Sequence, residues 1–503
     1  MSLLSRRGLF QGGGLAAGLL GLGARSGAAA PLAVGPDLYA SIGVTPLVNC
    51  RGTYTIISGS QTLPEVKRAM ELASQSYVHI DELMEAVGRR LAELTQAEWG
   101  MVTAGCAAAL THATAACIAG ADPEKMQRLP NLAGLKHEVV VPKYSRNEYD
   151  HAVRMLGVKM VEVETAAEFE AALSPATAMV MILSCPAAEK GELSIENASA
   201  MARRKGVPVL VDAAAETLTV PNLHLGHGAT LVAYSGGKCL RGPQSAGLLL
   251  GRKDLVQAAF LNSAPHHAFG RSLKMGKEEI MGMLAAVEMW VKRDHEAEWR
   301  QWQGWLDGIG ARAKQVAGVT TEILQPEDLS NHAPRLRIRW DGRKLGITGN
   351  EVEELLLHGK PRIAVNESSG NRRGDMASSL TIMPYMMMPG DDRIAAEAIY
   401  RLLSSPPHID DPAAPSGPPA NVDGQWDAHL TFVNGSADHH FVFEQHDAQL
   451  LGTHRGSTLQ GDLKGTVEGR RVRFRSGHRI EGTTLRYEFT ADVNGDTMEG
   501  EVA

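Results

Sequence analysis

The sequence contains, at positions 234–244, the stretch Tyr234-Ser-Gly-Gly-Lys-Cys-Leu-Arg-Gly-Pro-Gln244, in which Lys238 lies in a glycine-rich turn. An apolar run at 207–212, Val-Pro-Val-Leu-Val-Asp, precedes this turn and predicts a buried strand that ends in the carboxylate of Asp212. Such a pair suits pyridoxal 5′-phosphate (PLP), because the lysine forms an imine with the cofactor while the carboxylate keeps the pyridine nitrogen protonated. We therefore predict Lys238 and Asp212 as the catalytic pair.

A second segment of small residues, at 103–109, follows a strand pattern and opens an alanine-rich helix. Small side chains there let backbone N–H groups approach an anion at the positive end of the helix, which suits the PLP phosphate. Ser235 is placed to donate its hydroxyl to the same phosphate, and the small Ala214 leaves room for a flat ring against the strand. Besides the catalytic pair, the predicted cofactor-binding residues are Gly105, Cys106, Ala107, Ala214, Ser235 and Arg271.

The first 30 residues have the pattern of an export signal. Ser5-Arg6-Arg7 is followed by an apolar, glycine-rich run at 12–23 and by small residues at 24–30. Paired arginines are typical of the twin-arginine (Tat) pathway, and the apolar run is shorter than the roughly 20 residues that span a bilayer. We predict cleavage near Ala28 to Ala30 and a periplasmic location reached through the Tat machinery.

The composition limits the classes of partner. A net charge of −7 argues against nucleic acid, and no other apolar run is long enough for a stable membrane anchor. The five cysteines and 18 histidines are scattered without the spacing of a metal site, so we predict no bound metal. The sequence leaves open whether any of the cysteines pair.

Residues 31–405 alternate short apolar segments with helical patterns, which favours a mostly parallel sheet with helices on both faces. We divide this α/β region into a large domain at 31–330, with an N-terminal segment, and a small domain at 331–405. One long helical pattern, at 278–316, falls near the C-terminal end of the large domain in the sequence. Six prolines between 406 and 420 predict an extended linker.

The pattern changes after the linker. From residue 421 to 503, apolar and polar residues alternate, and glycines separate six or seven short segments. This predicts a small antiparallel β-barrel or sandwich. We consider two roles for this domain: assembly or stability on the one hand, and a lid or ligand-binding domain on the other.

Five segments carry a further signal, at 49–55, 102–109, 149–154, 235–244 and 270–277. Together they resemble the selenocysteine synthase-like (L-seryl-tRNA selenium transferase-like) family of fold-type I PLP enzymes. Within that family the chain is most similar to D-glucosaminate-6-phosphate ammonia-lyase-like members. The resemblance covers residues 36–405 and implies a large PLP domain, a small C-terminal domain, Lys238 as the Schiff-base lysine and Asp212 as the pyridinium partner.

The resemblance also implies the reaction and the assembly. We expect β-elimination of the ammonia-lyase or dehydratase type on an amino acid or amino-sugar acid, through a Lys238 aldimine, with the freed lysine taking the Cα proton. A racemase or epimerase, an aldolase and, from another class, a non-catalytic periplasmic binding or scaffold protein are alternatives. We also expect a homodimer or larger homo-oligomer, in which Arg271 reaches the neighbouring subunit's phosphate with its planar fork of donors.

Overall fold

We describe the chain from a computed structural model, which describes residues 32–411 and 417–503. The predicted export signal at 1–30 lies outside these residues, as does the middle of the predicted linker. Contacts divide the chain into a unit of residues 43–410 and a unit that contains the C-terminal region from Asp411 onward. This division falls within the predicted linker at 406–420.

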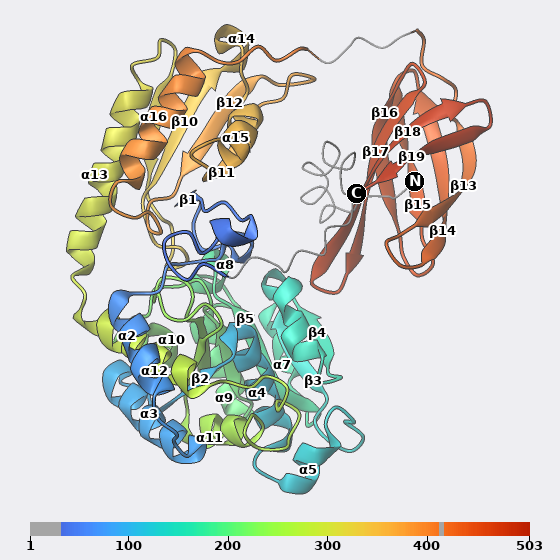
Figure 1. The fold of residues 1–503 in the computed structure, drawn as a ribbon. Coiled ribbons are helices and arrows are strands. Elements are labelled where there is room, and N and C mark those ends of the chain that lie inside the picture. Colours follow the sequence, from blue (N-terminus) through green and yellow to red (C-terminus); the bar gives the residue numbers. More distant parts are fainter. Residues whose placement is uncertain (1–31, 412–416) are drawn as a thin grey trace, which may run out of the picture. The chain divides into compact units, whose positions relative to one another are not determined.

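The unit of residues 43–410 contains a seven-stranded sheet (Figure 1). Its strands are β2 (Trp99–Thr103), β3 (Glu138–Pro142), β4 (Lys159–Val163), β5 (Thr177–Leu183), β6 (Val209–Asp212), β7 (Leu231–Ser235) and β8 (Gly247–Gly251). They lie in the order β2-β8-β7-β6-β5-β3-β4, in which only β8 runs antiparallel to its neighbours. Every residue of β6 is buried, as in parallel sheets that are covered on both faces. The predicted α/β fold with a mostly parallel sheet is confirmed.

Helices pack along this sheet, and α4 lies closest to the predicted site. Alanine makes up much of α4, so its backbone approaches β7 and β8 closely. In the ranges that the structure describes, no helix combines the length and the apolar composition needed to cross a membrane. The helices of this part are α2 (Pro64–Ser74), α3 (Ile80–Thr95), α4 (Gly105–Ala119), α5 (Pro123–Arg128), α6 (His151–Arg154), α7 (Ala166–Ala172), α8 (Pro186–Glu189), α9 (Ile195–Arg204), α10 (Leu223–Gly226), α11 (Lys253–Leu261) and α12 (Lys277–Lys292).

The long helical pattern predicted at 278–316 is two helices rather than one. The first is α12, and the second is α13 (His295–Ala313). Between them Arg293 has extended backbone angles, and the side chain of Asp294 accepts a hydrogen bond from Ala297 N, which caps the start of α13. The apolar spacing continues across the break because both helices bury an apolar face. α12 packs in the large domain, whereas α13 packs on the smaller domain (Figure 1).

The smaller domain has a five-stranded sheet of order β1-β11-β12-β10-β9, and α13 and α16 pack together beside it. Its sheet takes a strand from near the N-terminus and one from before residue 330, because β1 pairs with β11 and β9 pairs with β10. β9 ends at Leu324, before the predicted boundary at 330/331, so the sheet of the smaller domain includes a strand that the prediction placed in the large domain. The elements are β1 (Val48–Cys50), β9 (Thr320–Leu324), β10 (Arg335–Asp341), α14 (Gly342–Leu345), α15 (Gly349–His358), β11 (Ile363–Ser369), β12 (Ala377–Ile382) and α16 (Asp391–Ser404).

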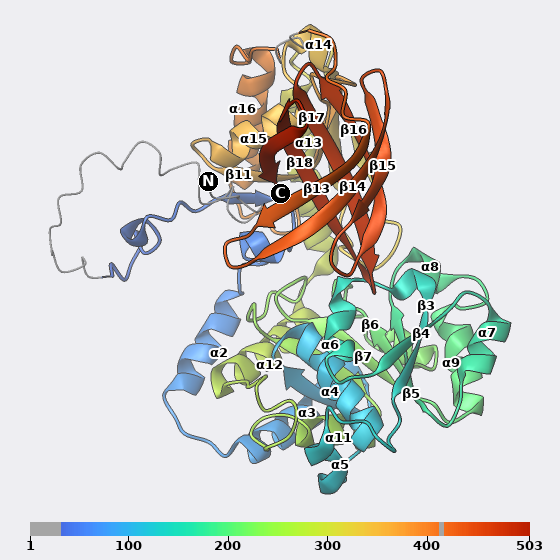
Figure 2. The same ribbon diagram turned by 90° about the vertical axis from the view of Figure 1, so that its right-hand side faces the viewer.

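The C-terminal region forms a seven-stranded antiparallel sheet in which each strand pairs with the next (Figure 2). The strands are β13 (Gly424–Thr431), β14 (Ser436–His446), β15 (Gln449–Arg455), β16 (Gln460–Glu468), β17 (Arg471–Ile480), β18 (Thr483–Asn494) and β19 (Thr497–Val502). Alternate residues face one apolar core, which contains Phe441, Phe443, Phe474 and Phe489. The predicted small antiparallel β domain is confirmed, and its strands form one curved sheet instead of the two sheets of a sandwich.

Candidate active site

Lys238 and Asp212 meet at the carboxyl ends of two neighbouring strands. Asp212 ends β6, and Lys238 lies three residues after the end of β7, which pairs with β6 in parallel. The turn that carries the lysine is closed by a 2.9 Å hydrogen bond from Arg241 N to Lys238 O and by a 2.8 Å bond from Gly242 N to Gly236 O. The positive charge of Lys238 is close enough to stabilise the ionised carboxylate of Asp212. The structure thus brings the predicted catalytic pair together.

Asp212 is a buried carboxylate with one oxygen committed to the protein. Its Oδ1 accepts hydrogen bonds from Ala214 N at 3.1 Å and from Cys106 Sγ at 3.5 Å. Burial raises the pKa of Asp212, and the hydrogen bonds and Lys238 oppose this effect only in part. Within the described ranges, no donor is hydrogen-bonded to Oδ2. A buried carboxylate is costly unless it is paired, so the positively charged N–H of a pyridine ring fits this oxygen.

The predicted phosphate end of the site lies at the start of α4. Gly105 has a φ of +81°, a left-handed conformation that glycine adopts without steric cost. Gly247 of β8 lies against it, since a Cβ at Gly247 would meet the carbonyl carbon of Gly105 at 2.3 Å. Cys106 is buried against Asp212, whereas Ala107 is exposed in the first turn. The first-turn N–H groups of α4, which have no partner within the helix, therefore lie next to Asp212, and such groups suit a phosphate.

Ser235 and Ala214 lie next to each other between these two ends, because Ser235 N donates to Ala214 O at 3.3 Å. Ser235 and Lys238 both line a cavity of about 540 Å3, which also takes Thr53 and Thr55 from the N-terminal segment. Arg271 is exposed on the loop between α11 and α12. Its role at a neighbouring subunit's phosphate stays a prediction.

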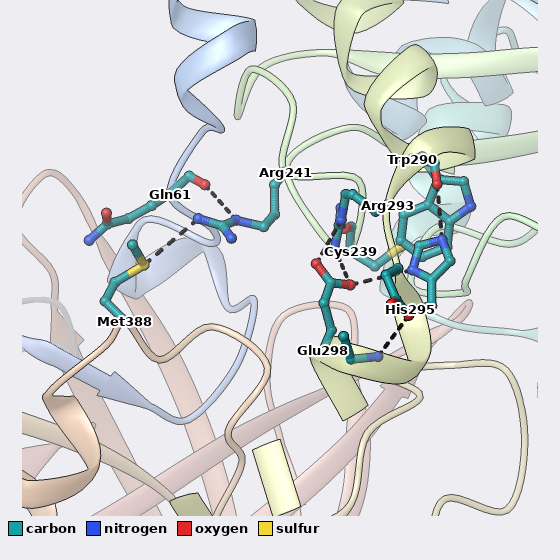
Figure 3. A network of polar contacts seen from close by, with 10 residues as sticks. Gln61, Cys239, Arg241, Trp290, Arg293, His295, Glu298 and Met388 are labelled. Atoms are coloured by element: carbon teal, nitrogen blue, oxygen red, sulfur yellow. Dashed lines mark hydrogen bonds and ion pairs between the residues drawn. The ribbon is translucent and has the colours of Figure 1, made fainter. Parts of the chain in front are cut away.

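A polar network that the sequence patterns did not reveal contacts the backbone of the lysine turn at Cys239 (Figure 3). Arg293 Nη1 donates to the carbonyl oxygen of Cys239, the residue after Lys238, at 3.3 Å. The same guanidinium donates from Nε and Nη2 to the two oxygens of Glu298 at 2.8 and 2.9 Å. Burial would raise the pKa of Glu298, but hydrogen bonds from His295 and Arg293 outweigh it and lower that pKa to about 2. Glu298 is therefore held ionised, and its partner Arg293 fixes the backbone beside Lys238.

Two further contacts join the smaller domain to the lysine cavity. Tyr385 OH lies 2.8 Å from Thr53 Oγ1, and it donates to Asn331 Oδ1 at 2.7 Å. Thr53 and Tyr385 are 332 positions apart in the chain. Their pairing left no local signal, although Thr53 belongs to one of the segments that carry the family resemblance.

The described residues contain no group of three or more His, Cys, Asp or Glu side chains arranged to hold a metal ion. All five cysteines are free. The site itself brings together a lysine, a buried carboxylate and the start of helix α4. Those are the groups that PLP uses.

No family model matches the chain. It is 30% identical to the D-glucosaminate-6-phosphate ammonia lyase of Salmonella typhimurium (strain 14028s / SGSC 2262) over 337 residues, which are 65% of this chain and 88% of that protein. It is 28% identical to a 5′-C-glycyluridine monooxygenase-decarboxylase of a Streptomyces species over 391 residues, 75% of this chain and 94% of that protein. A solved structure of D-glucosaminate-6-phosphate ammonia-lyase matches with a TM-score of 0.64 and 27% identity, covering 74% of this chain and 100% of that one.

Proposed function

The chain belongs to the family of D-glucosaminate-6-phosphate ammonia lyase and is a PLP-dependent enzyme of fold type I, and from this premise we propose that it releases ammonia from an amino acid or amino-sugar acid by β-elimination. The observation that carries the proposal is the similarity over 88% of an ammonia lyase, combined with the pairing of Lys238 and Asp212 at the strand ends. Because both residues are present and lie together, a non-catalytic scaffold is not supported.

When bound, PLP supplies an electron-withdrawing ring that stabilises negative charge on the substrate Cα. Asp212 Oδ2 would accept the N–H of the pyridine ring and keep that nitrogen protonated. The N–H groups of the first turn of α4, from Gly105 to Ala107, would bind the phosphate together with Ser235 Oγ. The small methyl group of Ala214 would leave room for the ring.

Lys238 is the group that holds the cofactor and moves protons. With a substrate bound, Lys238 Nζ would take the proton from the substrate Cα as a general base. For a β-hydroxy amino acid, the β-carbon then loses its hydroxyl group, and hydrolysis gives a 2-keto acid and ammonia. The hydrogen bonds that close the turn at Arg241 and Gly242 hold the backbone that carries Lys238.

The alternative reactions are racemisation or epimerisation, which starts from the same loss of the Cα proton, and aldol cleavage, which breaks the Cα–Cβ bond instead. The test is to incubate the PLP-loaded enzyme in D2O with D-glucosaminate 6-phosphate and with a panel of β-hydroxy amino acids. We expect ammonia and a keto acid in equal amounts. Deuterium at Cα without ammonia, or an aldehyde product, would contradict β-elimination.

We further propose export to the periplasm through the Tat pathway, supported by the paired arginines and the short apolar run near the N-terminus. Replacing Arg6 and Arg7 together by lysine in the full chain should leave the protein in the cytoplasmic fraction. Unchanged periplasmic recovery of the double variant would contradict this proposal.

We also propose a homodimer in which each site uses residues of both chains. Exposed apolar side chains on the N-terminal part of the unit, such as Tyr54, Ile56 and Tyr77, suit burial against a second copy. Mixing Lys238→Ala chains with Arg271→Ala chains should restore one of the two sites of each hybrid dimer. Verified hybrids that stay inactive would show that Arg271 does not serve the partner's site.

A further inference from the structure

Arg241 lies in the lysine turn itself. Its backbone N–H donates to Lys238 O, and its backbone oxygen accepts from Leu63 N at 3.1 Å. Its Nε donates to Gln61 O at 3.0 Å, and the next residue, Thr62, lines the cavity of Lys238. On the other side, Nη2 lies 3.7 Å from the sulfur of Met388 in the smaller domain (Figure 3). The guanidinium therefore stands where the lysine turn, the N-terminal segment and the smaller domain meet.

The positive charge of Arg241 lacks an anionic partner. In the described part of the chain, its side-chain contacts are a carbonyl oxygen and a thioether, and no carboxylate forms an ion pair with it. Burial lowers the pKa of Arg241, and the neighbouring Arg293 lowers it further. The carboxylates of Glu298 and Glu65 raise this pKa by smaller amounts, without forming an ion pair with Arg241. Of its five N–H groups, three have no protein acceptor beyond these contacts. A half-buried guanidinium in this condition is stabilised by any anion that reaches it.

The backbone of Arg241 is also strained. Its φ is +53°, in the left-handed region that residues other than glycine rarely adopt. Glycine would adopt this conformation without cost, and the turn around it already contains glycines at 236, 237 and 242. Strained residues of this kind concentrate where a side chain is needed for function, so the cost points to a role for the guanidinium.

We propose that Arg241 binds an oxyanion of the substrate, a carboxylate or a phosphate, and thereby restricts this enzyme to anionic amines. The turn places Cα of Arg241 within one β-turn of Cα of Lys238, and its Nε contacts Gln61, the residue before Thr62 of the lysine cavity, so the proposal puts the anion at the edge of that cavity. The planar fork holds two oxygens of one anionic group at once, which also orients the substrate. This inference rests on the proposed amine chemistry, but its test does not need turnover.

The test measures anion binding by calorimetry on protein whose cofactor has been fixed by borohydride, so that the phosphate site of PLP is already filled. The probes are inorganic phosphate and lactate, each titrated separately. We expect the wild type to bind one of them at a single site, Arg241→Gly to weaken that binding at least tenfold, and Arg241→Lys to lie between. The probe that depends on Arg241 identifies phosphate or carboxylate as the recognised group.

A matched control separates this role from a structural one. Gln96, at the end of α3, is exposed and has a φ of +59°, so Gln96→Gly relieves the same kind of strain in the same unit. Both glycine variants should keep or raise the melting temperature, and only Arg241→Gly should lose anion binding. Equal binding in wild type and Arg241→Gly, no binding of either probe to the wild type, or a lower melting temperature for Arg241→Gly alone would overturn the proposal. Absence of ammonia release together with Arg241-dependent binding would instead refute only the proposed reaction.

Discussion

Arg293 holds the backbone of Cys239, because its Nη1 donates to the carbonyl oxygen of that residue at 3.3 Å. Cys239 is also held through its side chain, since its Sγ donates to Glu216 O at 3.0 Å. Glu216 belongs to the segment that follows Asp212. Cys239, the residue after Lys238, therefore contacts both the connection between α12 and α13 and the segment that follows the buried carboxylate of Asp212.

Arg293→Met should impair the position of Lys238 without removing any group from the reaction. The variant leaves Glu298 without its main partner, which costs about 1–3 kcal/mol of stability for a half-buried pair. We expect kcat to fall about tenfold at saturating PLP, with KM nearly unchanged, because a displaced base weakens a proton transfer. The control is Arg300→Met, whose exposed pair with Glu296 contributes little. Unchanged kcat in Arg293→Met would refute this positioning role.

The same ion pair predicts a dependence of stability on pH. The pKa of Glu298 is about 2 in the folded protein and 4.5 without its partners, so its contribution is complete above pH 4.5 and is lost as the pH falls toward 2. In that window, the free energy of unfolding measured with urea should fall by up to about 1.4 kcal/mol per pH unit more in the wild type than in Glu298→Gln. Parallel pH profiles for the two proteins would show that Glu298 is not held ionised by its neighbours.

Gly247→Ala should damage the phosphate end of the site. The added Cβ would meet the carbonyl carbon of Gly105 at 2.3 Å and Cys106 N at 2.6 Å, so the start of α4 must shift. We expect a loss of about 1–3 kcal/mol of stability and a weaker affinity for PLP in a cofactor titration. Gly304→Ala in α13 is the matched control, because its Cβ would meet no atom within 4 Å. Equal PLP affinity in both variants would contradict the assigned cradle.

The β domain should lose stability below neutral pH. His454 is fully buried among aromatic rings, where burial, followed by His478 and His439, lowers its pKa from 6.5 to about 3. Since the unfolded chain takes up a proton below pH 6.5 and the folded domain does not, stability falls from pH 6.5 toward pH 3. We expect a smaller decline in His454→Phe, measured by thermal unfolding of the full chain.

The control for this pH effect is His408→Gln, because His408 is largely exposed within the predicted linker. This variant should follow the wild-type profile. If the thermal stability of His454→Phe falls with pH as steeply as that of the wild type, the buried imidazole is not responsible for the decline.

Local signals in the sequence predicted the parts of the site that are close in the chain. The apolar run before Asp212 and the glycines around Lys238 predicted a strand end and a turn, because burial and tight turns restrict residue types locally. Likewise, α9 begins where the sequence offers a local capping residue, because the side chain of Ser194 accepts a hydrogen bond from Asn197 N.

Contacts between distant residues were beyond the reach of such patterns. Arg293 and Cys239 are 54 positions apart, and neither one carries a periodic signal that points to the other. The break at Asp294 was missed because apolar spacing continues through it, although an aspartate three residues before its partner N–H is a capping signal. The pairing of β1 with β11 is likewise a long-range choice of sheet edge, made by packing.

The central claim is that Lys238 holds PLP, and one measurement tests it directly. Purified full-length protein is incubated with PLP, reduced with borohydride, digested and analysed by mass spectrometry. We predict a yellow protein whose absorbance shifts on reduction, and a single phosphopyridoxyl adduct on the peptide that contains Lys238. Lys238→Ala should give no adduct. A wild-type protein without the adduct, or with the adduct on another lysine, would contradict the account.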